Sequence, residues 1–443
     1  MIKRAVGIFL LLLFLLTLFF WYRNYSSYQN ALPINTSWAI KLQVDGLLKD
    51  MALNALGYPS YYLEGSKVSS DNEKDGLKRG FRLPANIFAY GVKGQPNAIF
   101  TRLPLADSSH FKAFVSHHLK LTAFTQHQKY TVGHSDNQHI QVLFNHKLAV
   151  ITYFIKNPDQ KLAEQVFFEN QFIQKEDTLL ARLKSSKNHL TFIQDQKNIT
   201  FHFGNGEIKM QGNLPIHADW EVQEKVNAPQ FDPESALTFY SMGKVKKGAN
   251  LNTFLPKIKF NLEADSLIRH FKGGIGIQVG KPVVQQDSVI TYEYDDDFEK
   301  VALPTVQESK VPSVEITIDS DADKLMRYLK GNNALSGTKL NRNLSPYLDL
   351  GVFSPSAERL VLSNSTFSNS QIQGTSEYFA RLEIDFQKLQ HYKISWSPFP
   401  LENFEKLDIS ASKKGEKIEV SGYLGFLNTE INALTQLNAV LGR

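Results

Sequence analysis

Two stretches of the sequence resemble each other: Glu207 to Leu214 reads EIKMQGNL, and Lys417 to Leu424 reads KIEVSGYL. Placed one above the other, they share isoleucine, glycine and leucine at equal positions, and Met210 falls on Val420. Both alternate apolar and polar residues, which is typical of a strand with one buried face. Another strand pattern and a charged turn precede each of them. We therefore expect a tandem duplication of a unit of about 200 residues.

The residues upstream of the first stretch predict a mixture of strands and helices. Trp38 to Val44 alternates as a strand and leads into an amphipathic helix. A second helix is expected from Asp107 to Leu119, with Asp107 or Ser108 as its N-cap. Strands at His139 to Phe144 and Lys147 to Phe154 should form a tight hairpin. In the second half, similar patterns follow one another in the same order.

The fold class predicted from these patterns is α+β. We expect an N-terminal transmembrane helix, followed by two similar domains of mostly antiparallel sheet with helices on one face. The predicted limits are 1–24 for a cytoplasmic tip and anchor, 25–32 for a short linker, 33–220 for the first domain, 221–235 for a second linker and 236–443 for the second domain.

The anchor prediction rests on the N-terminus. Residues 5–22 are almost entirely apolar and long enough for about one bilayer thickness. The stretch ends in aromatic residues and Arg23, without the small residues of a signal-peptidase site. Lys3 and Arg4 precede it, which favours a cytoplasmic N-terminus. The sequence therefore predicts an uncleaved single-pass anchor in a bacterial inner membrane, with the membrane as a partner through residues 5–22 and the body in the periplasm.

The composition excludes several classes of function. The chain has no cysteine, which rules out disulfides, thiolate metal sites and cysteine nucleophiles. In a large exported protein this also favours a bacterial periplasm over a multicellular host. Forty-nine basic residues against forty-four acidic ones give a net charge of +5, so we expect no nucleic-acid partner.

Histidines gather in one part of the sequence, between residues 110 and 146. Only His110 and His117 have a spacing that places them on one helical face, and a His-Glu-x-x-His motif is absent. We expect ordinary surface or half-buried histidines and no metal site. The residues concerned are His110, His117, His118, His127, His134, His139 and His146.

Two acidic clusters have similarly plain explanations. Asp295, Asp296 and Asp297 lack the spacing of a calcium loop and fit a charged hairpin turn. The alternating aspartates at 319, 321 and 323 fit the start of a helix, where carboxylates are favourable. The sequence also contains no Gly-x-Ser-x-Gly and no phosphate-binding glycine loop. We therefore predict no catalytic, metal-binding or cofactor-binding residues and no cofactor.

An aspartate follows the predicted strand in Val44-Asp45-Gly46-Leu47 and again in Ile318-Asp319. With a short tip and one anchor, this layout resembles uncharacterised single-pass envelope proteins of Gram-negative bacteria, known as domains of unknown function. The stretch from Leu407 to Phe426 also resembles the β-rich repeats of large envelope lipid-transfer proteins. These resemblances imply an envelope location and a duplicated fold, and they imply no functional residue.

The function expected from the sequence is non-enzymatic binding or scaffolding, with an envelope protein or lipid as the partner. The alternation in most strands favours this hypothesis, since a free sheet edge or an apolar patch suffices for it. A lipid or lipoprotein carrier is the first alternative, and it would need strands that are apolar on both faces, as Leu148 to Phe154 nearly is. A hydrolase acting on an envelope substrate is the second.

Overall fold

The computed structural model describes residues 2–63, 79–174, 177–246, 262–294, 298–365, 373–394 and 401–441. The chain divides into two compact units. Unit 1 comprises residues 1–213 and 429–435, and unit 2 comprises residues 214–428 and 436–443. The domain limits drawn from the sequence stay a prediction.

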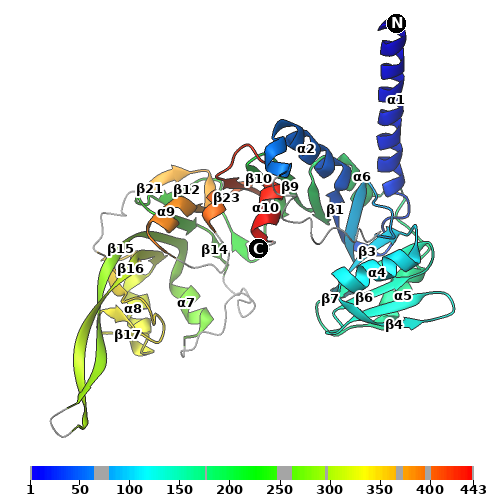
Figure 1. Cartoon of the computed structure of the whole chain (residues 1–443). Helices are drawn as coiled ribbons and strands as arrows, with labels where there is room; N and C mark the ends of the chain where they lie inside the picture. The colour runs from blue at the N-terminus through cyan, green and yellow to red at the C-terminus, as the bar shows by residue number, and fades with distance from the viewer. Residues whose placement is uncertain are drawn as a thin grey trace. The chain divides into compact units, whose positions relative to one another are not determined.

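The main sheet of unit 1 is antiparallel throughout its described pairings, in the order β10–β9–β8–β1–β2–β3–β7–β6–β5–β4. Figure 1 shows these elements in blue to green. Its strands are β1 (Thr36–Gln43), β2 (Asn86–Val92), β3 (Gln95–Pro104), β4 (Leu121–Gln126), β5 (Thr131–Ser135), β6 (Ile140–Phe144), β7 (Leu148–Phe154), β8 (Leu190–Gln194), β9 (Lys197–Phe203) and β10 (Glu207–Pro215).

The helices of unit 1 whose full extent is described are α1 (Ile2–Ser27), α2 (Val44–Gly57), α4 (Ser108–His118), α5 (Gln160–Phe168) and α6 (Thr178–Ser185). Helices α5 and α6 contribute Leu162, Val166 and Leu183 to a core that also holds Phe100 and Phe154 from the sheet. Helix α4 covers a second core around Phe111 and Phe144.

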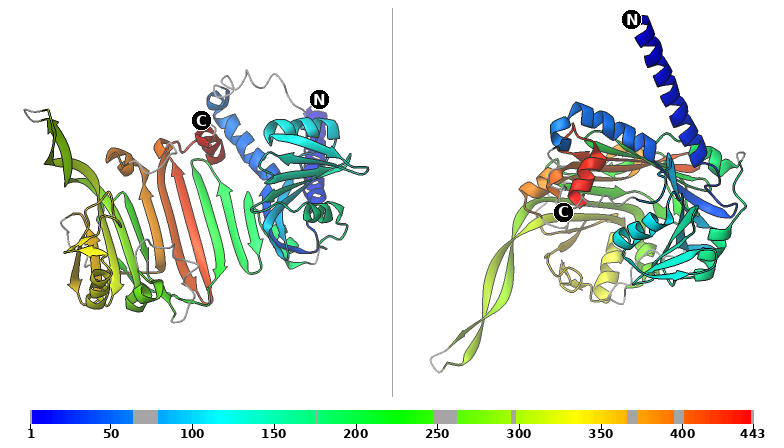
Figure 2. Two further views of the ribbon diagram at one scale, coloured as in Figure 1. Left: turned by 90° about the horizontal axis from the view of Figure 1, so that it is seen from below. Right: turned by 45° about the vertical axis from the view of Figure 1, so that its right-hand side comes forward.

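The main sheet of unit 2 is also antiparallel, in the order β24–β23–β22–β13–β15–β16–β20–β19–β18–β17. Its strands lie side by side in the left view of Figure 2. They are β13 (Leu237–Ser241), β15 (Phe271–Tyr294), β16 (Lys300–Ser320), β17 (Leu335–Ser336), β18 (Lys339–Leu340), β19 (Gly351–Ser356), β20 (Arg359–Ser363), β22 (Tyr378–Asp385), β23 (Phe404–Lys414) and β24 (Lys417–Phe426).

Two small sheets pair β11 (Trp220–Glu221) with β14 (Lys244–Val245), and β12 (Val226–Pro229) with β21 (Gln373–Ser376). The remaining elements are α7 (Ala264–His270), α8 (Ala322–Gly331), α9 (Phe386–His391), the 3-10 helix η2 (Leu401–Asn403) and α10 (Ala433–Leu441).

The two strand orders correspond position by position. In unit 1 the central strand β1 pairs with β8 on one side and with β2 on the other. In unit 2 the central strand β13 pairs with β22 on one side and with β15 on the other. The stretch EIKMQGNL lies in β10 and KIEVSGYL lies in β24, which take corresponding positions in the two orders. Both stretches alternate apolar and polar residues, and this pattern suits a strand that buries one face.

The predicted fold class needs correction. In the described part of the chain, no helix is long and apolar enough to cross a membrane. The predicted transmembrane helix over residues 5–22, and with it the signal anchor, the single-pass topology and the inner-membrane location, is therefore wrong. The predicted predominance of antiparallel sheet is found, because strands make up 47% of the described residues and helices 26%, and the strands form extended antiparallel sheet.

Candidate functional site

The histidines between residues 110 and 146 do not converge. His110 contacts Asp107 at 2.9 Å, His127 stacks on Tyr130, and His139 contacts the carbonyl oxygen of Phe154 at 2.7 Å. Burial lowers the pKa of His134. Each of these rings therefore has its own local environment, and the absence of a metal site among them stays a prediction.

A different group of possible metal ligands exists among the described residues: Asp50, His189 and His202. His189 is buried, and its Nδ1 accepts a hydrogen bond of 3.0 Å from the backbone N–H of Phe203. Nε2 must then carry the proton, and it donates to Asp50 over 3.1 Å. Since a metal ligand needs a free ring lone pair, His189 is not arranged for coordination. The pair instead ties α2 to the start of β8, and the hydrogen bond from Phe203 links it to β9.

The structure places the acidic residues singled out in the sequence in different surroundings. Asp295 to Asp297 lie outside the described residues. Asp321 is the N-cap residue of α8, but its side chain makes no capping hydrogen bond and pairs with Lys324 at 2.6 Å. Asp319 pairs with Arg359 at 3.1 Å. The predicted position at a helix start is confirmed, whereas side-chain capping is not seen. Asp107, by contrast, caps α4 as predicted, accepting from the backbone N–H groups of Ser109 and His110.

The feature that sets unit 2 apart is a long hairpin. Strands β15 and β16 pair from Phe271 with Ser320 out to Tyr294 with Lys300. Near the sheet, β13 and β20 flank them, but these neighbours pair no further than Val279 and Glu315. We call the part beyond, residues 282–294 and 300–312, the arm. It projects from the rest of unit 2 in Figures 1 and 2.

One face of the arm is apolar and open to solvent. In its register Ser288 lies opposite Val306, Ile290 opposite Pro304, and Tyr292 opposite Ala302. Residues that lie opposite each other in an antiparallel pair point to the same face. Ile290, Tyr292 and Val306 are 66%, 63% and 62% exposed. These side chains therefore form a continuous apolar strip with nothing covering it in the described structure.

Proline distinguishes the two edges of the arm. Pro304 and Pro312 interrupt β16, whereas β15 contains no proline between Val283 and Tyr292. Proline has no N–H, so in a paired strand it stands where the N–H would point away from the partner. Ile290, opposite Pro304, consequently directs its own N–H and C=O to the outer edge of β15. The outer edge of β15 thus presents an unbroken row of backbone groups, and that of β16 does not.

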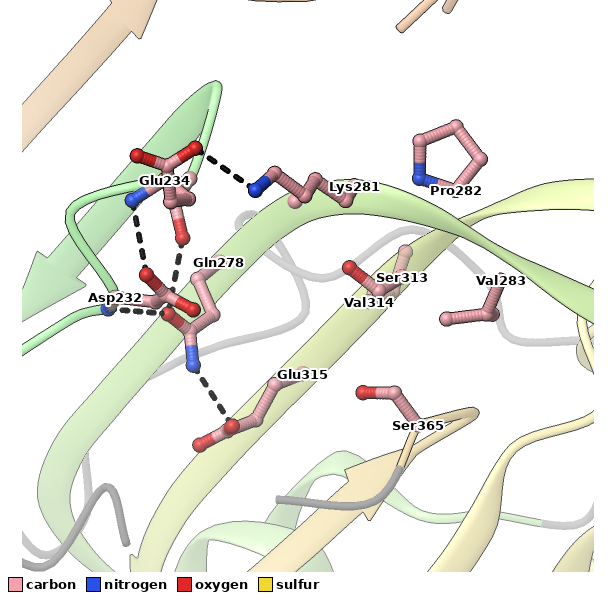
Figure 3. A pocket seen from close by; sticks show the side chains of 12 residues that line it. Asp232, Glu234, Gln278, Lys281, Pro282, Val283, Ser313, Val314, Glu315 and Ser365 are labelled. Atoms are coloured by element: carbon pink, nitrogen blue, oxygen red, sulfur yellow. Dashed lines mark hydrogen bonds and ion pairs between the residues drawn. The ribbon is translucent and has the colours of Figure 1, made fainter. Parts of the chain in front are cut away.

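A small pocket lies at the base of the arm (Figure 3). It has a volume of about 220 Å³. Gly280 pairs with Ser313 and Pro282 with Pro312, so Lys281 is an extra residue in β15 and forms a bulge. The bulge directs Lys281 to Glu234, at 3.0 Å. This ion pair raises the pKa of Lys281 and lowers that of Glu234.

Hydrogen bonds fix the floor of this pocket. Gln278 accepts from the backbone N–H of Asp232 and the hydroxyl of Ser235, at 3.0 and 3.1 Å. Its amide nitrogen donates to the buried carboxylate of Glu315 at 2.7 Å, as Figure 3 shows. The polar groups therefore bind one another and hold the arm's base rigidly. Such a site positions an element of the fold.

Comparisons with known proteins add little. No family model matches the chain, and no curated protein matches its sequence. Three solved structures, crystal forms I, III and IV of TP0453, match with TM-scores of 0.23, 0.21 and 0.22 at 8%, 8% and 7% identity. They cover 78%, 77% and 77% of this chain, and 95%, 96% and 94% of their own. Scores this low carry no argument about fold or function.

Sequence reasoning missed the arm, although a signal was present. It predicted a charged hairpin turn at Asp295 to Asp297 but did not extend the strand pattern on either side of that turn. The apolar residues Val301 and Leu303 continue the alternation of β16 on the far side of Asp295 to Asp297. A pattern placed symmetrically about one acidic turn indicates a single long hairpin.

Proposed function

We propose that this chain is a non-enzymatic binding protein that captures an extended segment of a partner protein along the outer edge of β15. The observation that supports this is the combination of a free, proline-less strand edge with the exposed strip of Ile290, Tyr292 and Val306. A long exposed edge with apolar side chains is a liability in an isolated protein, because it invites pairing. Addition of a partner strand would cover the edge, and its side chains would pack on the strip.

The charge of the arm indicates the chemistry of the partner. Acidic residues far outnumber basic ones between Pro282 and Val314, although the whole chain has a net charge of +5. A segment that alternates apolar residues with lysine or arginine would complement both the strip and the charge. The residues concerned are the acidic Asp287, Glu293, Asp295, Asp296, Asp297, Glu299 and Glu308 and the basic Lys300 and Lys310.

The pocket at the base supports binding over catalysis. Its lysine and carboxylates are engaged with each other, so they serve to hold the arm in place. A rigid base reduces the entropy that the arm loses when a partner binds. The lipid-carrier and hydrolase hypotheses remain untested predictions.

The proposal can be tested by photo-crosslinking the full chain in its native cells. Benzoylphenylalanine would replace Tyr292 on the strip or, as a control, Tyr347, which is 83% exposed and whose backbone contacts Gln285 on the opposite face of the arm. We expect a discrete protein adduct from position 292 and none from 347. The adduct should map to an extended segment that contains lysine or arginine.

Two proline variants separate the edges. Ser288→Pro removes an outward N–H from β15, and Lys310→Pro removes an outward N–H from β16 without changing the strip. We expect Ser288→Pro to abolish the adduct and Lys310→Pro to preserve it. Equal adducts from 292 and 347, insensitivity to Ser288→Pro, or an adduct only to a second copy of this chain would each overturn the proposal.

A further inference from the structure

A hollow of about 550 Å³ in unit 1 is rich in arginine. It lies between the C-terminal end of α1, the segment 82–86 and the faces of β2, β3 and β7. Arg23, Arg82 and Arg102 line it together with the amides of Gln29, Asn30 and Asn86. No aspartate or glutamate is among its lining residues. We call it the arginine hollow.

Arg102 is the central cation of the arginine hollow. It projects from β3 and is half-buried, with its guanidinium over the ring of Phe172 at 4.9 Å. One nitrogen, Nη1, makes long contacts of 3.3 and 3.4 Å to the carbonyl oxygens of Val166 and Glu169. Within the described residues no carboxylate lies within 4.0 Å of it. Burial lowers the pKa of Arg102, yet a guanidinium keeps its charge in proteins.

The nearest acid does not neutralise Arg102. Glu169 turns its carboxylate back to its own loop, accepting from the backbone N–H groups of Asn170 and Gln171 at 2.8 and 2.7 Å. A half-buried cation without a counter-ion is costly, and an anion in the hollow would offset that cost. Its remaining N–H groups, which have no acceptor in the described structure, supply the donors for such an anion.

The other two arginines have different roles. Arg23 is neutralised by Asp45, with contacts of 3.1 and 2.8 Å, and also donates to the carbonyl oxygen of Leu83. It therefore fixes the wall of the hollow. Arg82 is exposed and has no carboxylate within 4.0 Å among the described residues. Two uncompensated guanidinium groups, Arg82 and Arg102, thus share the hollow.

The floor adds a second polar group. Asn86 is 2% exposed, and its amide nitrogen donates to Asn24 and Ser27 at 2.9 and 2.8 Å. Its buried carbonyl oxygen, Oδ1, has no partner among the described residues. That oxygen can accept a hydrogen bond from a hydroxyl group. Phe88 and Leu148 provide an apolar wall beside it.

We propose that the arginine hollow binds an organic phosphate monoester, whose two charges match Arg82 and Arg102 and whose hydroxyl-bearing part faces Asn86. The hollow is larger than inorganic phosphate requires, which leaves room for the organic part. This site lies in unit 1 and is independent of the partner-binding function proposed for the arm. The ester is either a soluble molecule or the headgroup of a lipid, and both present the same chemistry.

Calorimetric titration of the full chain with glycerol phosphate tests the soluble source, and sedimentation with vesicles tests the lipid source. The vesicles would contain lysophosphatidic acid, a phosphate monoester that keeps one free hydroxyl, in phosphatidylcholine or, as the neutral comparison, phosphatidylcholine alone. We expect binding in at least one of these two experiments. Each of Arg82→Gln and Arg102→Gln should weaken it about tenfold or more, as loss of one charge-assisted hydrogen bond implies. The experiment that shows binding identifies the source.

Arg182→Gln is the matched control, because Arg182 also donates to two backbone carbonyl oxygens but lies on α6, away from the hollow. It should leave the affinity unchanged. Arg82 is exposed, so Arg82→Gln is expected to fold even if Arg102→Gln does not. Absence of binding in both experiments, or an equal loss of affinity in Arg182→Gln, would overturn the proposal.

Discussion

The ammonium group of Lys41 lies 2.7 Å from the carbonyl oxygen of Leu183, at the C-terminal end of α6. It also donates to the carbonyl oxygen of Ser186 at 2.6 Å. Lys41 is only 1% exposed, and among the described residues no carboxylate pairs with it. A buried cation thus satisfies carbonyl groups that the helix leaves free at its end. Burial lowers its pKa from 10.5 to about 8.

This lowered pKa predicts that the protein gains stability from pH 8 to pH 10. In that range the unfolded chain keeps a proton on Lys41 that the folded protein has released. Raising the pH therefore stabilises the folded state relative to the unfolded state. The gain from this one group is at most about 1.4 kcal/mol per pH unit. We would measure the thermal unfolding midpoint of unit 1 at pH 7.5, 8.5 and 9.5.

Lys41→Met provides the comparison for that measurement. The variant should be less stable, because the carbonyl oxygens of Leu183 and Ser186 lose their donor, and its midpoint should lack the rise above pH 8. Measurements above pH 10 would mix two effects, because burial raises the pKa of Tyr28 to about 12. Above pH 10 the unfolded chain loses the proton of this tyrosine before the folded protein does, and this lowers the stability. An identical rise in both proteins contradicts the assignment.

His189 predicts the opposite behaviour in acid. Burial and then the neighbouring His202 lower the pKa of His189, although Asp50 works against them. As the pH falls below about 6.5 the unfolded chain takes up a proton before the folded protein does, so stability declines. His189→Gln keeps a donor for Asp50 and an acceptor for Phe203 but cannot titrate. We expect its unfolding midpoint to fall less between pH 7 and pH 5 than that of the wild type.

The exposed His146 offers the control for this experiment. His146→Gln also removes one histidine, but from the hairpin between β6 and β7, where the ring is open to solvent. Its acid sensitivity should match that of the wild type. If His189→Gln loses as much stability in acid as His146→Gln does, then His189 is not the group responsible.

These buried groups show what the sequence could and could not predict. Strand β1, the cap at Asp107 and the β6–β7 hairpin follow from alternation and turn chemistry, which are local. The contact of Lys41 with Leu183, and of His189 with Asp50, joins residues more than a hundred positions apart. Such contacts depend on which strands pair, and a periodic pattern does not contain that information. The arginine hollow was missed for the same reason.

The N-terminus was overestimated from its composition. Its apolar run fits a bilayer in length, and the aromatic and basic residues that flank it supported the prediction of an anchor, whereas no helix in the described chain meets the requirement for a span. The arm was underestimated because the acidic run was interpreted as a hairpin turn without extending the strand pattern on either side of it.

The arm predicts a sharp difference between neighbouring proline substitutions. Ser288 lies opposite Val306 in a pair whose N–H groups point outward, whereas the N–H of Val289 points to β16. Ser288→Pro should therefore leave the hairpin intact, and Val289→Pro should remove a ladder hydrogen bond and loosen it by about 1 kcal/mol or more. Amide hydrogen exchange along β16 would show the difference. Equal loss of protection in both variants would refute the assignment of the free edge.

The turn between β9 and β10 predicts a substitution that unit 1 tolerates poorly. Gly206 has a φ of +64°, and a Cβ there would lie 2.4 Å from the Cα of Thr429. Its N–H donates to the carbonyl oxygen of Ile431 at 2.8 Å, so the turn holds the returning segment 429–435. Gly206→Ala should cost about 1 to 3 kcal/mol from the backbone conformation alone, and more from the clash.

Gly94 separates the two contributions. It has a similar φ of +76° in the β2–β3 turn of the same unit, but a Cβ there would meet nothing within 4 Å. Gly94→Ala should therefore show the backbone cost only, and Gly206→Ala should lower the unfolding midpoint further. It should also increase hydrogen exchange in residues 429–435, which Gly94→Ala should leave protected. Equal effects of the two substitutions would mean that Thr429 moves aside freely and that the turn does not hold this segment.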